Sequence, residues 1–596
     1  MGLLRFALVL SLLLFAAASG CATGRPVPLE NDASVDASRP RDSGIPVDAP
    51  CAAGEQRCDG VCRAADDPRY GCGASSCTAC APPAGAVARC EGGTCAFDCD
   101  AGRIDLDGDP SNGCEYACAR SGDLDLVDAA FVDANCDGTD GVLASCVFVS
   151  AAHGDDASAD GTRAAPYATI GAALSAATTL GRRSVCVAGG DYAEALVVPA
   201  GIDVLGGFDD ADAVFPYRRS ASATTTVHAT GAVLTIPSAT LPAQIAGLTI
   251  ACEGPGTDGS SYGVLVLAGS APLAIDDDVI TVAAGADGAR GDDGVPAAMP
   301  APTGNAGADG TASSSSGGTG TSSPSCAERG GRGGDGGFSD MDGMMGSTGS
   351  GGASGGPIGM ASRACGTPSM GGGTGQAGGR GGAGMAGTGG MGLGTLGANG
   401  YLPAAGRMGG NGANGRGGGG GGGGGGGSCT FGGSCTCAPD RAGGGGSGGC
   451  GGVGGPPGLG GAGGGGSFGI VIAEGSVVIS DCTITTGDGG EGGRGGDGAS
   501  GQVHGDGGPG GAAADDGGRG GMGGPGGDGG AGGPGGGGGG GPSACVARAS
   551  GASATVTTTR CMLGAAGPGG SGGTNSVGAI GGLGTSGVAS AQVVLP

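Results

Sequence analysis

The chain has 596 residues, of which 156 are glycine and only 3% are aromatic, so much of it cannot form an ordinary hydrophobic core. The formal net charge of −27 argues against binding to nucleic acid, because phosphates attract clustered basic residues. The charge instead indicates a soluble exterior that repels other anions.

Residues 1–20 predict a lipoprotein signal peptide. Arg5 precedes an apolar run, Phe6 to Ala17, that is too short to span a bilayer. The following Ala18-Ser19-Gly20-Cys21 resembles the lipobox of bacterial lipoproteins, although alanine stands where that family prefers leucine. The resemblance implies acylation of Cys21 and, because Ala22 rather than aspartate follows, a lipid anchor in the outer membrane. An ordinary secretory signal is the alternative.

Residues 21–50 lack hydrophobic periodicity and predict a disordered stalk. The next segment, 51–118, contains eleven cysteines and few aromatic residues, so we expect disulfides to replace the core of this module. Because eleven is odd, one cysteine should pair outside the module, and Cys136 and Cys146 are the nearest candidates.

Two acidic stretches, the second within a linker over 119–142, place oxygen ligands at alternate positions, as calcium loops do. The candidate metal ligands are Asp105, Asp107 and Asp109 in the first stretch, and Asp133, Asn135, Asp137 and Asp140 in the second. Both stretches lack the glutamate that an EF-hand has at its twelfth position. Weak calcium binding and a solvated acidic linker without metal both stay open, and no other cofactor is expected.

A helix is expected near residue 170, because Ile170, Leu174 and Ala177 share one helical face. Pro166 suits the first turn of this helix and Gly181 suits its end. Short runs rich in Val, Ile and Leu follow and predict strands.

The Gly-Thr and Pro-Tyr-Ala-Thr-Ile segments at 161–170 precede Gly189-Gly190-Asp191-Tyr192 and Gly206-Gly207-Phe208. Together they resemble the opening of predicted surface proteins of the pectate-lyase-like superfamily. The resemblance covers residues 143 to about 285 well and the glycine tracts not at all. It implies an all-β fold for 143–596, a right-handed parallel β-helix with an N-terminal capping helix.

A motif of paired strand-like runs recurs three times, beginning at Ser261, Ser467 and Ser543. One such unit cannot bury its apolar face alone, so the copies should stack on one another. Long glycine-rich insertions at 285–466 and 487–542, and a third tract near residue 564, leave the repeat at the same phase. We therefore expect them to project from one corner of successive coils.

The glycine tracts allow two interpretations. Gly-Gly-X triplets recur over 517–528, and a three-residue period suits a polyglycine-II-like bundle with hydrogen bonds between neighbouring segments. A solvated, mobile loop is the other interpretation, because glycine gains nothing from burial.

The stacking of the second and third copies predicts a disulfide between Cys482 and Cys561. Both lie late in the second strand-like run of their copies, and adjacent strands are about 4.8 Å apart. That spacing is within the usual separation of two disulfide-bonded residues.

The sequence predicts a non-catalytic cell-surface lipoprotein that displays a β-helix and a glycine-rich fringe. Its expected role is adhesion, or contact with a polysaccharide, matrix or cell-surface partner, and no catalytic residue is assigned. The alternative is a polysaccharide lyase or glycoside hydrolase that uses Asp276 and Asp278 with Arg218 or Arg219.

Overall fold

The computed structural model describes residues 50–73, 77–211, 217–311, 316–364, 367–427 and 440–596. Its internal contacts divide the chain into two units. Unit 1 comprises Met1–Pro82 and Ala86–Asp98, and unit 2 comprises Pro83–Gly85 and Cys99–Pro596.

Unit 1 contains short strands that disulfides hold together. Strand β1 (Glu55–Cys58) pairs antiparallel with β2 (Val61–Ala64), and β3 (Ala86–Glu91) pairs with β4 (Thr94–Cys99). A 3-10 turn, η1 (Pro68–Tyr70), lies between the pairs. The disulfides are Cys51–Cys62, Cys58–Cys77, Cys72–Cys90 and Cys80–Cys95. The expectation that disulfides hold this region together is confirmed.

The cysteine-rich sequence continues into unit 2. Strands β5 (Arg103–Ile104) and β6 (Tyr116–Ala117) pair antiparallel, and η2 (Leu143–Ser145) follows. Cys99 pairs with Cys114, and Cys118 pairs with Cys136. The prediction that one cysteine of the module pairs outside it, with Cys136 as a candidate, is therefore confirmed.

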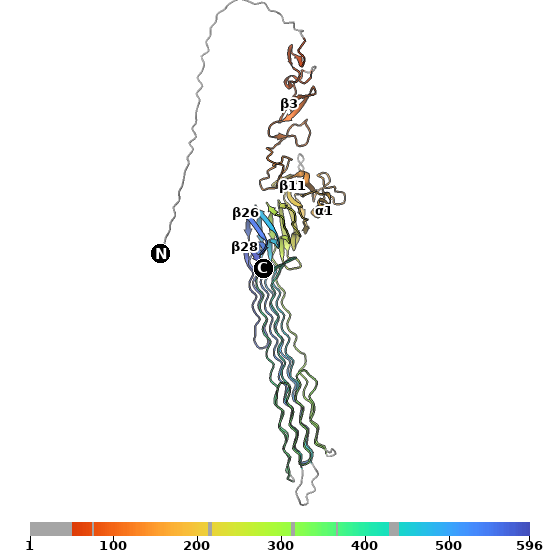
Figure 1. The fold of residues 1–596 in the computed structure, drawn as a ribbon, viewed down its shortest axis with the longest axis vertical. Coiled ribbons are helices and arrows are strands. Elements are labelled where there is room, and N and C mark those ends of the chain that lie inside the picture. The colour runs from red at the N-terminus through yellow and green to blue at the C-terminus, as the bar shows by residue number, and fades with distance from the viewer. Residues whose placement is uncertain (1–49, 74–76, 212–216, 312–315, 365–366, 428–439) are drawn as a thin grey trace, which may run out of the picture. The chain divides into compact units, whose positions relative to one another are not determined.

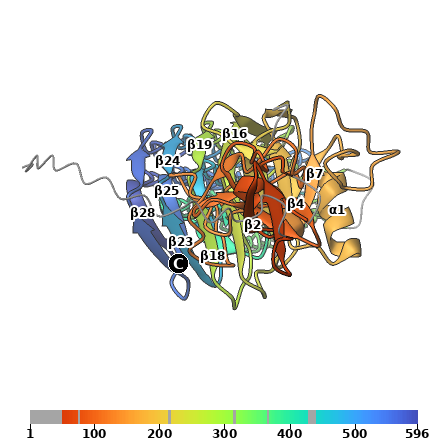
Figure 2. The same ribbon diagram turned by 90° about the horizontal axis from the view of Figure 1, so that it is seen from above.

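The parallel strands of unit 2 form a coil of three sheets, compatible with a parallel β-helix. Sheet A comprises β7 (Cys146–Val149), β8 (Ser184–Ala188), β11 (Asp203–Asp209), β15 (Ala243–Ala246), β18 (Leu273–Asp276), β23 (Ser476–Ser480) and β26 (Ser553–Thr557), with β12 (Arg218–Arg219) antiparallel to β11. Sheet B comprises β9 (Gly190–Tyr192), β13 (Thr225–Thr230), β16 (Leu248–Gly254), β19 (Val279–Val282), β24 (Thr483–Thr486) and β27 (Arg560–Met562). Sheet C comprises β10 (Leu196–Val197), β14 (Ala232–Ile236), β17 (Ser261–Val266), β22 (Ser467–Ile472), β25 (Ser543–Ala549) and β28 (Ala589–Leu595). The chain visits A, B and C in turn, and Figure 2 shows successive strands side by side from α1 to β28.

Helix α1 (Ile170–Leu180) packs against the beginning of the coil, and its residues Ile170 and Leu174 join the coil's core. Thr169 caps the helix by accepting a hydrogen bond from the Ala172 N–H, and Gly181 ends it with a φ of 65°. The predicted helix and its end are confirmed. The placement of Pro166 in the first turn is wrong, because the Thr169 cap starts the helix later.

The three repeat copies stack in register. Tyr262, Phe468 and Ala544 are aligned in sheet C, and Ile275 and Ile479 are aligned in sheet A. The inward-facing Val and Ile side chains form one continuous core. Burial of each such side chain contributes about 1.5–3 kcal/mol, so stacking stabilises what one copy could not.

A one-residue left-handed turn joins sheet A to sheet B in successive coils. Asp277, Asp481 and Thr558 have φ values of 54°, 53° and 47°. Each lies two residues before a position at which the strands of sheet B are aligned, so the three turns stack on one another. Aspartate tolerates this conformation, whereas a β-branched threonine is strained in it.

The glycine-rich segments leave the coil between sheets B and C in three successive turns. They follow β19, β24 and β27, and the chain returns at β22, β25 and β28. Figure 1 shows the extended segments running side by side away from the strands. The prediction of a shared corner is confirmed by this topology. The only strands within the segments, among the described residues, are β20 (Thr395–Gly397) and β21 (Gly400–Leu402), which form a hairpin.

These segments form an ordered array, which we call the glycine bundle (residues 284–392, 403–466, 487–542 and 564–588, where described). Backbone hydrogen bonds recur every third residue: the N–H groups of Gly285, Gly288 and Gly291 donate to the carbonyls of Asp488, Glu491 and Arg494. Antiparallel neighbours follow the same period, as in Gly490 to Gly465 and Gly493 to Ala462. The interpretation as a solvated loop is therefore wrong, and the polyglycine-II-like alternative describes the segments.

The spacing of glycine in a segment depends on whether the segment lies at the edge of the bundle or inside it. In the Gly523-Gly524-Pro525 triplet the two glycine N–H groups donate to Gly508 and Gly419, and the third residue, which needs no N–H, is partly exposed. In the unbroken tract, Gly418, Gly419 and Gly420 donate to three different segments, at Gly449, Gln376 and Ser347. A segment enclosed on all sides therefore needs glycine at every position, and an edge segment needs it at two positions in three.

Candidate functional site

The solvent-facing positions of the glycine bundle form its main candidate contact surface. All ten methionines of the insertions lie there, with exposed fractions from 55% to 82%. They are Met299, Met341, Met344, Met345, Met360, Met370, Met385, Met391, Met408 and Met522. Methionine is flexible and apolar, so exposed methionines on a fixed backbone favour contact with other surfaces.

Ion pairs form both within and between segments of the bundle. Arg290 contacts Asp293 and Asp497 at 2.6 and 3.2 Å, and Arg494 contacts Asp497 at 2.7 Å. Partial burial is the largest single influence on the pKa of Asp497 and raises it. The hydrogen bonds from Thr574 and Arg494 together outweigh burial, so the pKa of this carboxyl is lowered. Such exposed pairs contribute about 0–1 kcal/mol each, so the backbone hydrogen bonds dominate the cohesion of the bundle.

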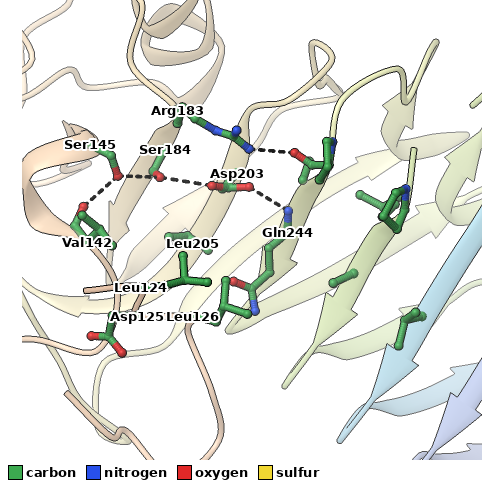
Figure 3. Close-up of a pocket in the computed structure, with 16 residues that line it drawn as sticks. Leu124, Asp125, Leu126, Val142, Ser145, Arg183, Ser184, Asp203, Leu205 and Gln244 are labelled. Atoms are coloured by element: carbon green, nitrogen blue, oxygen red, sulfur yellow. Dashed lines mark hydrogen bonds between the residues drawn. The ribbon is translucent and has the colours of Figure 1, made fainter. Parts of the chain in front are cut away.

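An apolar groove of 510 Å³ lies on the outer face of sheet A, beside the acidic linker (Figure 3). Leu124 and Leu126 of the linker line it together with Leu205 and Leu273 of sheet A. The Gln244 amide holds the linker in place by donating to the Val127 carbonyl at 2.8 Å. The groove can accept an apolar group, and its titratable lining residues are Asp125, Arg183 and Asp203.

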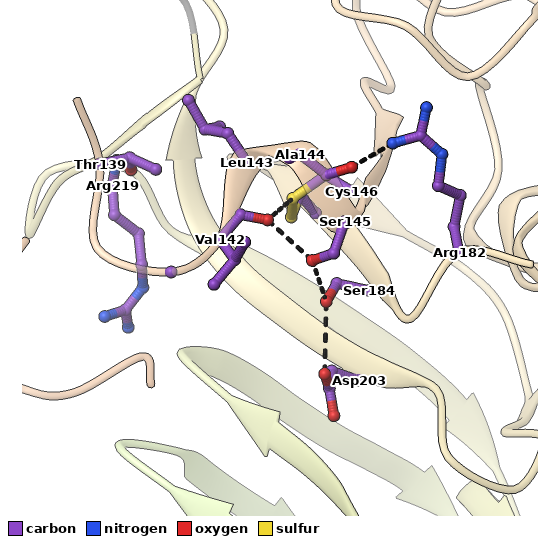
Figure 4. Close-up of a disulfide and its surroundings, with 12 residues drawn as sticks. Thr139, Val142, Leu143, Ala144, Ser145, Cys146, Arg182, Ser184, Asp203 and Arg219 are labelled. Atoms are coloured by element: carbon purple, nitrogen blue, oxygen red, sulfur yellow. Dashed lines mark hydrogen bonds between the residues drawn. A yellow bond between two sulfur atoms is a disulfide. The ribbon is translucent and has the colours of Figure 1, made fainter. Parts of the chain in front are cut away.

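A polar wall borders this groove (Figures 3 and 4). The hydroxyl groups of Ser145 and Ser184 lie 2.9 Å apart, and Asp203 accepts hydrogen bonds from Ser184 and from the Gln244 N–H. Burial raises the pKa of Asp203 above its usual value. The disulfide Cys146–Cys186 joins neighbouring strands of sheet A nearby. These contacts fix the first coils, and they do not form a nucleophile activated by a base.

Arg219 is a structural residue rather than a substrate-binding one. Its side chain is 1% exposed and forms ion pairs with Asp140 at 2.5 Å and Asp277 at 2.8 Å. It also donates to the carbonyls of Gly206 and Asp128. Burial raises the pKa of Asp140 to about 7, against the lowering effect of Arg219. The guanidinium therefore joins the linker to the turn between sheets A and B, and a substrate cannot reach it.

The two aspartates of the alternative catalytic hypothesis, Asp276 and Asp278, lie in different surroundings. Asp276 accepts a hydrogen bond from the Ser480 hydroxyl at 2.6 Å, whereas Asp278 is 1% exposed and accepts from the Leu248 N–H. Burial raises the pKa of Asp278 well above its usual value, and its second oxygen has no partner among the described residues. The left-handed turn at Asp277 separates the two. Asp276 and Asp278 therefore do not form a carboxylate pair on one accessible face.

The first predicted calcium loop brings some of its carboxylates together. Oxygens of Asp105, Asp107 and Glu115 lie within 4.8 Å of one another. Asp109 instead accepts a hydrogen bond from the Ser111 N–H. Burial raises the pKa of Asp105, while backbone and Asn112 hydrogen bonds lower that of Asp107. Glu115 was missed by the sequence reasoning, although its position ten residues after Asp105 was a usable signal.

In the second predicted loop, the side-chain oxygens accept hydrogen bonds from other groups of the protein. Asp133 accepts hydrogen bonds from the Tyr116 hydroxyl and the Gly138 N–H, and Asn135 accepts from the Asp137 N–H. Asp140 is the partner of Arg219. In the described part of the chain, no three His, Cys, Asp or Glu ligand atoms gather at 133–140.

The predicted disulfide between Cys482 and Cys561 is wrong. Cys561 pairs with Cys545, and Cys482 is a buried free thiol. The register explains the difference, because Cys561 is aligned with Ile484, two residues beyond Cys482. Cys482 therefore lies at the turn between sheets A and B, whereas Cys561 points into the coil toward sheet C.

The predicted lipidation site, Cys21, lies outside the described residues. None of the helices in the described part of the chain has the length and hydropathy needed to cross a membrane. No protein-family model matches the chain, and no curated protein or solved structure is significantly similar to it. The function is therefore inferred from the geometry alone.

Proposed function

We propose that this chain is a non-catalytic cell-surface lipoprotein that uses its glycine bundle for adhesion or for contact with polysaccharide or matrix. Acylation at Cys21 would anchor it in the outer membrane, and the three sheets would form a right-handed parallel β-helix, the usual hand of such crossovers. The observation that carries the proposal is the ordered bundle, whose glycine interior is closed and whose third-position side chains face solvent. A mere spacer would need no such order.

The test replaces 487–542 by a Gly-Ser repeat of the same length in the full chain. This segment is the hydrogen-bonding neighbour of several others, and alternating serine removes the adjacent glycines that the bundle requires. The β signal in circular dichroism should persist, because β24 and β25 keep their partners. Attachment of cells displaying the protein to a polysaccharide-coated or cell-coated surface should fall to background. Unchanged attachment would show that the segments act only as a spacer.

We also propose weak calcium binding at Asp105, Asp107 and Glu115. Three carboxylates within one ion's reach favour a hard cation that takes oxygen ligands. Calorimetry on the full chain at millimolar calcium should show heat that Glu115→Gln reduces and that Asp506→Asn, an exposed control, leaves unchanged. Absence of heat in the parent protein would exclude this site.

A further inference from the structure

A second cavity, which we call the sheet C cleft, has the properties of a ligand site. It has a volume of 620 Å³ and is lined by residues of β13, β14, β17, the 255–258 loop and the β20–β21 hairpin. This size is within the range of about 300–1,000 Å³ that is usual for small-molecule sites. The cleft is separate from the apolar groove on sheet A and from the calcium loops.

The hairpin completes the cleft because aromatic residues hold it against sheet C. The Tyr401 ring lies 5.2 Å from that of Phe468, which stacks on Tyr262 at 5.7 Å. The Tyr401 N–H donates to the Tyr262 hydroxyl, which donates to Asp258 at 2.6 Å. These contacts fix both Asp258 and Asn399, which lies in the hairpin turn. A glycine-rich insertion thereby supplies a polar side chain to a cleft on the β-sheet.

Several polar groups of the cleft are available to a ligand. Within the described residues, the side chains of Thr230, Thr235, Thr257 and Asn399 make no hydrogen bond, and all four line the cavity. Asp258 accepts one hydrogen bond on each oxygen, from Tyr262 and from the Ser260 N–H, and each oxygen can accept another. The cleft thus offers hydroxyl, amide and carboxylate groups at fixed positions.

The apolar part of the lining includes Leu265, Leu267, Ala232 and Pro255. A cavity with hydroxyl and amide groups beside an aliphatic surface fits a sugar ring, which has hydroxyl edges and C–H faces. Among the described residues, no arginine or histidine lines the cleft, so a uronate, sulfate or phosphate group would have no counter-charge there. Asp258 and the net charge of −27 would repel such anions.

We propose that the sheet C cleft binds an uncharged sugar unit of a polysaccharide, with Asn399, Thr257 and Asp258 as its hydrogen-bonding residues. This deepens the proposed polysaccharide contact and rests on it, and it adds a sugar-binding site on the coil to the contact surface of the bundle.

The test measures binding of cellopentaose, chitopentaose and an oligogalacturonate of equal length to the full chain by calorimetry. At least one uncharged oligosaccharide should bind, and the oligogalacturonate should not. Asn399→Ala should weaken that binding about five- to tenfold, as expected for one lost hydrogen bond. Asn411→Ala, an exposed asparagine on the bundle, should leave it unchanged. Thr257→Arg should add binding of the oligogalacturonate.

The inference is overturned if no uncharged oligosaccharide binds, or if Asn399→Ala and Thr257→Ala both bind like the parent. The Gly-Ser replacement of 487–542 changes none of the residues that line the cleft. Oligosaccharide binding that persists in that variant while cell attachment is lost would support both proposals. Cell attachment that is unaffected by Asn399→Ala, with no oligosaccharide bound, would leave the adhesive bundle and remove the cleft.

Discussion

Replacing Gly381 by alanine should disrupt the glycine bundle, whereas the same replacement at Gly382 should not. A Cβ atom at 381 would lie 2.0 Å from the carbonyl oxygen of Ala413, while a Cβ at 382 would meet no atom within 4 Å. The two variants share the same chemical change and the same effect on the unfolded chain, which by itself favours alanine by about 0.4–1 kcal/mol. The difference between them therefore isolates the packing of the bundle.

The cost at 381 follows from the hydrogen bonds around it. A tolerable contact requires the segments to separate by about 1 Å, which breaks three bonds of 2.8 Å: Gly381 to Asp528, Ala413 to Gly382, and Gly530 to Ala413. At about 1 kcal/mol each, the loss is about 3 kcal/mol. Amide hydrogen exchange at Ala413 and Gly530 should become on the order of 100-fold faster in Gly381→Ala than in Gly382→Ala. Equal exchange in both variants would refute the close packing.

Three further predictions concern the coil. The raised pKa of Asp278 means that the folded state holds this proton more tightly than the unfolded state. Stability should therefore fall as pH rises above 3.8, the usual value, until the folded pKa is passed. Asp278→Asn should remove this loss, which is about 1.4 kcal/mol for each tenfold difference in proton affinity between the folded and unfolded states. The variant should therefore raise the unfolding midpoint at pH 7 but not at pH 3, and a gain at both pH values would contradict the ionisation argument. Thr558→Asn should stabilise the last coil by about 1 kcal/mol, because asparagine tolerates the left-handed φ of 47° better than threonine does. A lower unfolding temperature in this variant would show that the backbone of Thr558 is not strained. Cys482 should resist alkylation until the protein is denatured, because it is buried and burial raises its thiol pKa. Peptide mapping should recover a Cys545–Cys561 disulfide. A native thiol that reacts rapidly, or a Cys482–Cys561 peptide, would disprove this pairing.

The sequence was sufficient to predict those features of the fold that depend on local periodicity. Alternating Val and Ile placed the strands, and recurrence of the Ser-initiated motif placed the stacked copies and the common corner of the insertions. It could not place Cys482, because the alignment of the second and third copies differs by two residues from the one expected. Cys561 is aligned with Ile484 in a strand of sheet B, whereas Cys482 lies in the turn before that strand.

Contacts between distant residues were also beyond prediction. Arg219 meets Asp140 and Asp277 only after the coil forms, so its burial was invisible in the sequence. Asn399 likewise reaches the sheet C cleft only because Tyr401, in the same hairpin, packs on Phe468. The order of the glycine segments depends on partners hundreds of residues away, and composition alone favoured a solvated loop.

The three-residue period of the bundle has a consequence for how this protein can change in length. A gain or loss of one triplet moves a segment by about 9 Å and returns every side chain to its former direction. A gain of one residue would turn outward-facing side chains toward a neighbouring backbone. The offset between donors and acceptors does change by one residue between Gly294, bonded to Asp497, and Ala301, bonded to Val503. That change occurs across Val295 to Pro300, an exposed stretch without glycine. Inherited length variation should therefore come in multiples of nine nucleotides wherever the Gly-Gly-X triplets are regular, and in any multiple of three where they are interrupted.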